Sequence, residues 1–114
     1  MQYPEFIHEA KTKLGVLTEG EVLDITRAFL HTLTRHLAGN AADNMGAQLP
    51  GPLLDMIREI PAEERQQGER FKLTQFYDRV ADQLGVDPEQ GKTVTRQFMQ
   101  VFRQLVTAGE LHKI

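Results

Sequence analysis

The polar side chains best suited to chemistry in this sequence stand at matched positions. Thr26-Arg27 is followed 69 residues later by Thr95-Arg96. Two such guanidiniums could bind an anion or a partner's carboxylate, because arginine offers a fork of N–H donors that fits two oxygens. In the competing structural interpretation, the arginine lays its stem on apolar surface and ties down a glutamate or a helix C-terminus. The sequence favours the structural interpretation.

The histidines are poorly spaced for a metal site on a helix. His31 and His36 stand five positions apart, whereas two histidines on one helix share a metal at a spacing of three or four, as in H-E-x-x-H. We predict no metal site and interpret His36 as a partly buried, hydrogen-bonded side chain. A small-ligand or anion site between the two halves of the chain, near Arg27, Arg96 and His36, is an open alternative, because ligands prefer such junctions.

Missing residue types exclude several kinds of chemistry. The 114 residues include no cysteine and no serine, so disulfides, thiolate metal sites and Ser or Cys nucleophiles are impossible. The carboxylates do not form a pattern typical of an acid and a base poised in a cleft. The nine glycines do not form a phosphate-binding loop. We therefore predict that the chain is not an enzyme and uses no cofactor.

Charge and hydropathy exclude further classes of partner. A net charge of −3 argues against nucleic acid, because proteins that bind it gather basic charge to displace counterions from phosphate. No apolar run is long enough to span a membrane. Residues 1–5 also lack the basic start and apolar stretch of a signal peptide. We expect a cytoplasmic chain that contacts neither nucleic acid nor membrane.

A repeated apolar pattern predicts the elements that position these residues. The two copies are Tyr3, Phe6, Ile7, Ala10 and Leu14, then Leu73, Phe76, Tyr77, Val80 and Leu84. Each copy has the spacing of one helix face and ends in Leu-Gly-Val, which is typical of a glycine C-cap. Thr18 and Asp87 are the predicted N-caps of the longer helices that follow. Pattern and ending together indicate a duplication.

The long helices align as Ile25-Thr26-Arg27 with Val94-Thr95-Arg96. The first is apolar on more than one side, so we expect it at the centre of the fold. Short helices are predicted over about 41–49 and 53–60. The sequence thus predicts one all-α domain over 1–114, a compact bundle of about six to seven helices in two tandem pseudo-symmetric units. The first unit covers 1–60, an exposed polar linker covers 61–71, and a shortened second unit covers 72–114.

These motifs resemble the bacterial domain-of-unknown-function 2267 family. The matching elements are Tyr3-Pro4-Glu5-Phe6, Leu14-Gly15-Val16, Thr26-Arg27-Ala28, Gln48-Leu49-Pro50 and Phe76-Tyr77-Asp78-Arg79-Val80. The resemblance covers nearly the whole chain and implies a compact helical protein with two tandem repeats. It implies no activity, substrate or catalytic residue.

One departure from the family pattern predicts a contact surface. The resemblance implies a Leu-Pro element in each repeat, yet the second copy stops at Ile114, before any partner for Leu49-Pro50. We therefore expect Phe98, Phe102 and Val106 to lack cover from their own chain, and such apolar patches mark contact surfaces. In the alternative, helices of the first unit fold over this face. The sequence favours a non-enzymatic module that works by protein–protein contact, including self-association as a homodimer.

Overall fold

The helices of the computed structural model begin and end where the sequence supplies caps and breakers. The structure describes residues 1–106, and its helices are α1 (Tyr3–Leu14), α2 (Glu19–His36), α3 (Ala41–Gly46), α4 (Gly51–Arg58), α5 (Ala62–Gln67), α6 (Leu73–Leu84) and α7 (Pro88–Phe102). Within these residues the β-type pairing is a single isolated bridge between Ala38 and Gln67. The prediction of an all-α bundle of about six to seven helices is confirmed.

The predicted caps are present at both copies of the repeated pattern. Gly15 and Gly85 end α1 and α6 with φ angles of 67° and 68°, a left-handed conformation that glycine adopts without strain. At the start of α2, Thr18 Oγ1 accepts a hydrogen bond from the backbone N–H of Glu21 at 3.1 Å. At the start of α7, the Asp87 carboxylate accepts one from the N–H of residue 90 at 2.8 Å. Short-range side-chain chemistry therefore fixes where these helices start and stop.

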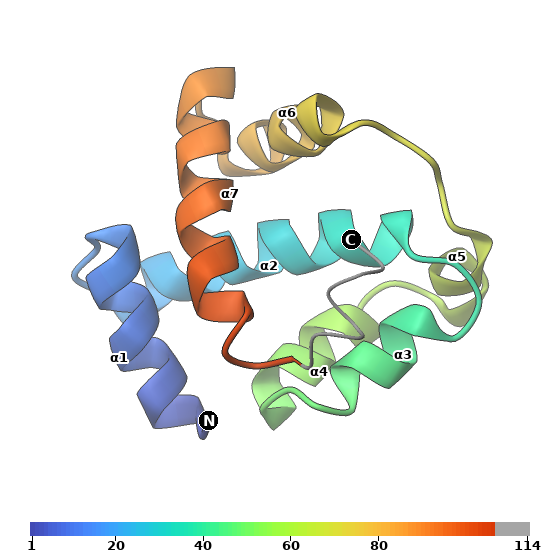
Figure 1. Cartoon of the computed structure of the whole chain (residues 1–114), viewed down its shortest axis with the longest axis horizontal. Coiled ribbons are helices and arrows are strands. Elements are labelled where there is room, and N and C mark those ends of the chain that lie inside the picture. The colour runs from blue at the N-terminus through green and yellow to red at the C-terminus, as the bar shows by residue number, and fades with distance from the viewer. Residues whose placement is uncertain (107–114) are drawn as a thin grey trace.

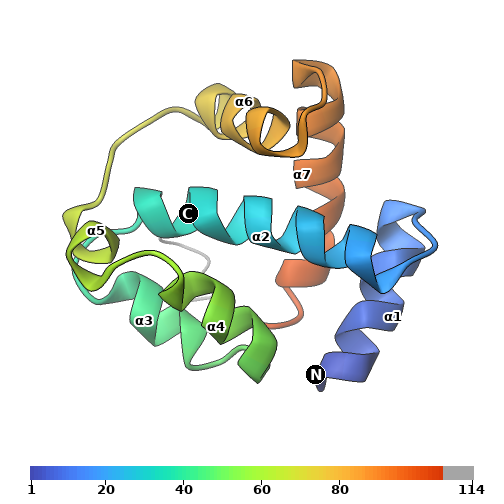
Figure 2. The ribbon, with the colours of Figure 1, turned by 180° about the vertical axis from the view of Figure 1, so that it is seen from behind.

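The long helix α2 is the centre of the molecule. Figures 1 and 2 show α6 on one side of α2 and α3 and α4 on the other, while α7 crosses it. The helix accordingly buries side chains around most of its circumference, including Ile25, Phe29, Leu30 and Leu33. The prediction that this helix is central, because it is apolar on more than one side, is confirmed. The radius of gyration, 13.1 Å, fits a compact chain of this length.

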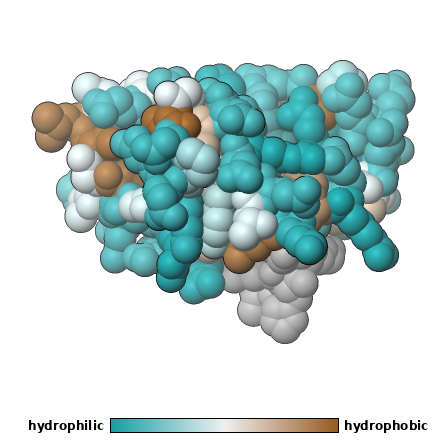
Figure 3. Space-filling view, turned by 90° about the horizontal axis from the view of Figure 1, so that it is seen from above, coloured by the Kyte–Doolittle hydropathy of each residue, from teal (hydrophilic) through white to brown (hydrophobic). Residues whose placement is uncertain are grey.

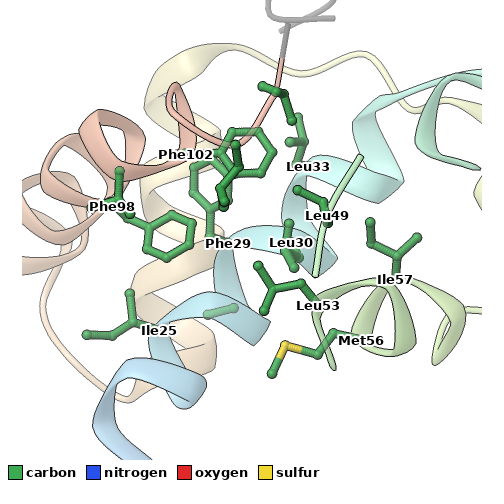
Figure 4. Close-up of a cluster of buried hydrophobic side chains, with 14 of the residues drawn as sticks. Ile25, Phe29, Leu30, Leu33, Leu49, Leu53, Met56, Ile57, Phe98 and Phe102 are labelled. Atoms are coloured by element: carbon green, nitrogen blue, oxygen red, sulfur yellow. The ribbon is translucent and has the colours of Figure 1, made fainter. Parts of the chain in front are cut away.

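Phenylalanine rings at the core join two helix pairs, α1 with α2 and α6 with α7. The Phe29 ring lies 4.8 Å from Phe98, 5.1 Å from Phe102 and 5.4 Å from Phe76, measured between centroids. Figure 4 shows Phe98 and Phe102 from α7 beside Phe29 from α2. Phe6 of α1 makes its own contact with Phe98 at 6.1 Å. Each short helix thus packs on the long helix of the other pair, α1 on α7 and α6 on α2.

These contacts between the two helix pairs correct one prediction. Phe98 and Phe102 are fully buried and Val106 is 8% exposed. The prediction that these three residues form an exposed apolar patch is therefore wrong. The alternative holds for the two phenylalanines, because Phe29 and Phe6 of the first pair of helices cover them. The sequence identified the side chains as apolar but did not reveal which helix would cover them. The face seen from above in Figure 3 is mostly hydrophilic, with small separate hydrophobic areas.

The segment predicted as a polar linker, 61–71, is largely exposed but holds the helix α5. Arg65 anchors it: Nε donates to Asp43 Oδ1 at 3.0 Å and Nη1 to the Ile60 carbonyl at 2.6 Å. The backbone N–H of Glu69 donates to the Arg35 carbonyl at the end of α2. Helix α5 has no buried residue, so no apolar pattern could predict it. The end of the predicted second unit, 107–114, lies outside the described residues.

Candidate functional site

Arg27, the first predicted binding residue, is paired with a carboxylate. Its Nε donates to Glu59 Oε1 at 3.0 Å and its Nη2 to Oε2 at 3.2 Å. His31, one turn along α2, brings Nε2 within 2.8 Å of the same Oε1 and within 3.0 Å of the Met56 carbonyl. Glu59 is the C-cap residue of α4, where a negative charge is unfavourable beside the helix dipole. The Arg27 guanidinium offsets that charge, and the hydrogen bonds of both α2 side chains hold α4 against α2.

The electrostatics of this network are those of a structural ion pair. The hydrogen bonds from Arg27, and then its charge, lower the pKa of the Glu59 carboxyl below its ordinary value of 4.5. The hydrogen bond to Glu59 likewise raises the pKa of Arg27. Both side chains are more than 40% exposed, so solvent screens the pair. This is the arrangement that the structural interpretation of Arg27 predicted.

His36 also has structural partners. Its Nδ1 lies 3.1 Å from the Glu69 carbonyl, so that the Nδ1–H tautomer donates to it. Its ring packs against Phe71 with 4.8 Å between centroids. The guanidinium carbon of Arg79, on α6, lies 4.0 Å from the centre of the Phe71 ring. The same guanidinium pairs with the Glu69 carboxylate. The prediction of a partly buried, hydrogen-bonded histidine is confirmed, and the side chain ties the segment before α6 to the end of α2.

Arg96, the remaining predicted residue, lies in a surface hollow of about 300 Å³ between α6 and α7. We call this hollow the α6–α7 groove. It is lined by Leu73 and Tyr77 from α6 and by Thr95, Arg96, Met99, Gln100 and Arg103 from α7. Leu73 is 60% exposed and lies beside the half-buried side chains of Tyr77 and Met99 in the groove lining.

The groove contains charged groups without ion-pair partners in the described residues, and one lining residue has a buried, unpaired hydroxyl. Arg96 and Arg103 are exposed, and neither forms an ion pair among the residues that the structure describes. Thr95 is only 2% exposed, and its Oγ1 has no hydrogen-bond partner. The matched Thr26 in α2 donates its hydroxyl to the carbonyl of residue 22 at 2.7 Å. A buried hydroxyl without a partner is a free-energy cost to the folded chain.

A narrow contact between backbones sets the spacing of α6 and α7. Gly91 of α7 faces α6 so closely that a Cβ there would lie 2.6 Å from the Ala81 Cβ and 2.7 Å from the Tyr77 carbonyl oxygen. The aligned residue in α2 is Val22, which is fully buried. Only glycine permits this approach. Sequence reasoning missed the role of Gly91, which a comparison of the two aligned helices could have indicated.

The structure does not bring Arg27, Arg96 and His36 together. Arg27 lines a different hollow, with Asp24 and His31, from the one that holds Arg96. His36 lies nine residues beyond Arg27 on α2, which is about 13 Å along a helix axis. The expected junction site is therefore not formed by these three residues. Within residues 1–106, His, Asp and Glu side chains nowhere gather in a group that could hold a metal ion.

Comparison with known proteins places the chain in a family. Among the helices of residues 1–106, none has the length and apolar character needed to cross a membrane. No curated protein matches the sequence. The family model described as "Uncharacterized conserved protein (DUF2267)" matches residues 3–114, which is nearly the whole chain. The chain therefore belongs to the DUF2267 family, as its motifs and helical fold suggested.

Proposed function

We propose that this chain is a non-enzymatic helical module that acts by contact with another protein, including a second copy of itself. The α6–α7 groove is the observation that carries the proposal. It combines an exposed leucine, Leu73, with two arginines that lack ion-pair partners in the described residues. Tyr77 and Met99 line the same groove. Protein interfaces are enriched in tyrosine, methionine and arginine, and tyrosine and arginine are prominent among the residues that contribute most of the binding energy.

The proposal includes an internal duplication of a helix pair. Equivalent phenylalanines make equivalent contacts, Phe6 with Phe98 at 6.1 Å and Phe76 with Phe29 at 5.4 Å. Phe29 and Phe98, which match each other, meet between the pairs at 4.8 Å. Two units related by a twofold axis place equal contacts on both sides of it in this way. The matched glycine caps of α1 and α6 support the same idea.

The bacterial cytoplasm is the setting that we propose for this contact. The chain has no cysteine, so it gains nothing from an oxidising compartment. Its net charge of −3 suits a protein partner better than a nucleic acid. A fusion to a fluorescent protein, imaged in the cells that make the chain, tests the location. Fluorescence confined to the envelope would contradict it.

Site-specific photo-crosslinking tests the protein contact. A benzophenone amino acid in place of Leu73 should give discrete adducts with one or a few proteins in living cells. The same group in place of Leu17 should not, although Leu17 is 89% exposed, because it lies in the turn between α1 and α2. Light scattering at several concentrations measures self-association. A strictly monomeric chain without adducts at position 73 would overturn the proposal.

An anion or small ligand in the same groove is the second candidate function. The volume of about 300 Å³ is at the lower limit of ligand pockets. Arg96 and Arg103 would supply the charge for an anion. A thermal-shift screen with phosphate, sulfate and carboxylate metabolites tests this function. A raised Tm that disappears in Arg96→Gln would favour it over a protein partner, and no shift for any compound would remove it.

A further inference from the structure

We infer that the α6–α7 groove receives one amphipathic helix of a partner protein, with apolar residues at i, i+3 and i+4 and a carboxylate two to three residues later. The inference rests on the proposed function and specifies what the module binds. Helix-in-groove binding is a common mode of protein recognition, and it is identified by such spaced anchors. The chain already binds one of its own helices in this way.

Helix α4 is that internal example. It packs on α2 and buries Leu53, Met56 and Ile57, which have the spacing i, i+3 and i+4. Glu59 follows at its C-terminal end and receives two hydrogen bonds from Arg27. Figure 4 shows Leu53 and Met56 of α4 beside Leu30 of α2. One face of α2 is thus closed by an apolar helix whose acidic end meets an arginine.

The aligned face of α7 is open in residues 1–106. Arg96 matches Arg27 in the alignment of the long helices. Met99 matches Leu30, yet Leu30 is fully buried whereas Met99 is half-buried. On the short helices, Tyr77 of α6 is half-buried where the matching residue of α1, at position 7, is 6% exposed. The groove therefore presents the α7 counterpart of the surface that α4 covers on α2.

The charge of the groove selects an acidic helix. The chain has a net charge of −3, but the charged side chains that line the groove are Arg96 and Arg103. A carboxylate near the C-terminal end of a docked helix can receive two hydrogen bonds from Arg96, as Glu59 does from Arg27. A partner helix with a basic end would meet two uncompensated positive charges.

The chain's own α4 segment, added as a free peptide, is the probe. A peptide of residues 49–61 carries all the anchors, and a lactam between Asp55 and Lys introduced by Arg58→Lys keeps it helical. Both positions are exposed in α4, so the bridge does not touch the apolar face. The four methionines of the intact chain are labelled with ¹³C at the methyl group, because Met99 reports on the groove and Met56 on the native α4. The peptide itself is unlabelled.

We expect saturable shifts of the Met99 methyl signal on addition of the peptide, with the Met56 signal unchanged. Arg96→Glu should weaken binding about five- to tenfold, since it replaces an attraction by a repulsion. A peptide with Glu59→Lys should bind the Arg96→Glu chain better than the wild-type chain. Lys13→Glu, an equal charge change at an exposed position of α1, should leave the affinity within twofold. This exchange of charges distinguishes a direct pair from a general effect of charge.

Three outcomes would overturn the inference. A Met56 shift would mean that the peptide displaces the native α4 instead of filling the groove. A Met99 signal that depends on the concentration of the chain alone would assign the groove to a second copy. No Met99 shift at millimolar peptide would show that the groove does not bind such a helix. Adducts at position 73 in the crosslinking experiment would still support protein contact in that last case, so the two proposals fail separately.

Discussion

Gly91→Ala tests whether the contact between α6 and α7 is as close as the structure indicates. A methyl group at this position would lie 2.6 Å from the Ala81 Cβ, 2.7 Å from the Tyr77 carbonyl oxygen and 3.0 Å from the Ala81 Cα. Carbon atoms in ordinary contact are about 3.5–4.0 Å apart. Two of the three neighbours belong to the backbone of α6, so no side-chain rotation can relieve the clash. Helix α6 itself has to move by about 1 Å.

The expected loss of stability follows from two opposing effects. Overpacking of this kind costs about 1–3 kcal/mol, whereas alanine gains up to about 1 kcal/mol over glycine within a helix. We therefore expect Gly91→Ala to lower the free energy of unfolding by about 1–2 kcal/mol, and the Tm by about 4–10 °C. Because Tyr77 lines the groove, the displaced α6 should also weaken binding of the α4 peptide.

Urea denaturation followed by circular dichroism measures the free energy of unfolding. Gly20→Ala is the matched control, because Gly20 is an exposed residue of α2 whose added Cβ would have its nearest neighbour at 4.0 Å. This change should stabilise the chain by about 0.5 kcal/mol through helix propensity. If Gly91→Ala were as stable as Gly20→Ala, the close packing of α6 on α7 would be refuted.

Three further predictions concern the ion pair, the buried hydroxyl and the aromatic core. The pKa of Glu59 is lowered in the folded chain, so its contacts with Arg27 stabilise the fold above pH 4.5 and lose their effect as the pH falls through the folded pKa. Wild type and Glu59→Gln should differ by about 0.2–1 kcal/mol at pH 7 and converge in stronger acid, and a gap independent of pH would contradict this. Thr95→Val should leave stability unchanged or raise it by up to about 1 kcal/mol, since no hydrogen bond is lost, whereas Thr26→Val should lower it; equal effects in urea titrations would contradict the difference. Phe29→Ala should cost about 3–5 kcal/mol, measured by calorimetry, and a loss below 1 kcal/mol would show that Phe29 is not the centre of the core.

Local signals allowed most of the fold to be predicted. The ends of α1 and α6 followed from Gly15 and Gly85, and the start of α2 from Thr18, because caps depend on residues within one turn. The central place of α2 followed from its apolar residues on more than one side. These features depend only on the spacing and type of residues along one helix. They could therefore be predicted from the sequence without knowledge of the tertiary structure.

Features that depend on which helices meet could not be predicted. Phe98 was expected to be exposed because its own unit offers no cover, but Phe29 and Phe6 reach it from the other pair at 4.8 and 6.1 Å. Helix α5 was not predicted, because it has no apolar face that a periodic pattern could reveal. Hydrogen bonds from Arg65 anchor it instead. The partner of Arg27 is Glu59, 32 residues away, and no spacing rule connects them. Contacts at such distances along the chain are decided by tertiary packing.

The close contact at Gly91 has a consequence for how the groove would bind a helix. Because α6 and α7 touch through their backbones, the spacing between them does not depend on a third helix that holds them in place. A groove whose walls are already fixed loses little conformational entropy on binding. We therefore expect the chain to bind its partner with little backbone movement, and the ordering cost to fall on the partner helix. Peptides that are more helical in isolation should accordingly bind more tightly, even when their groove-facing residues are identical.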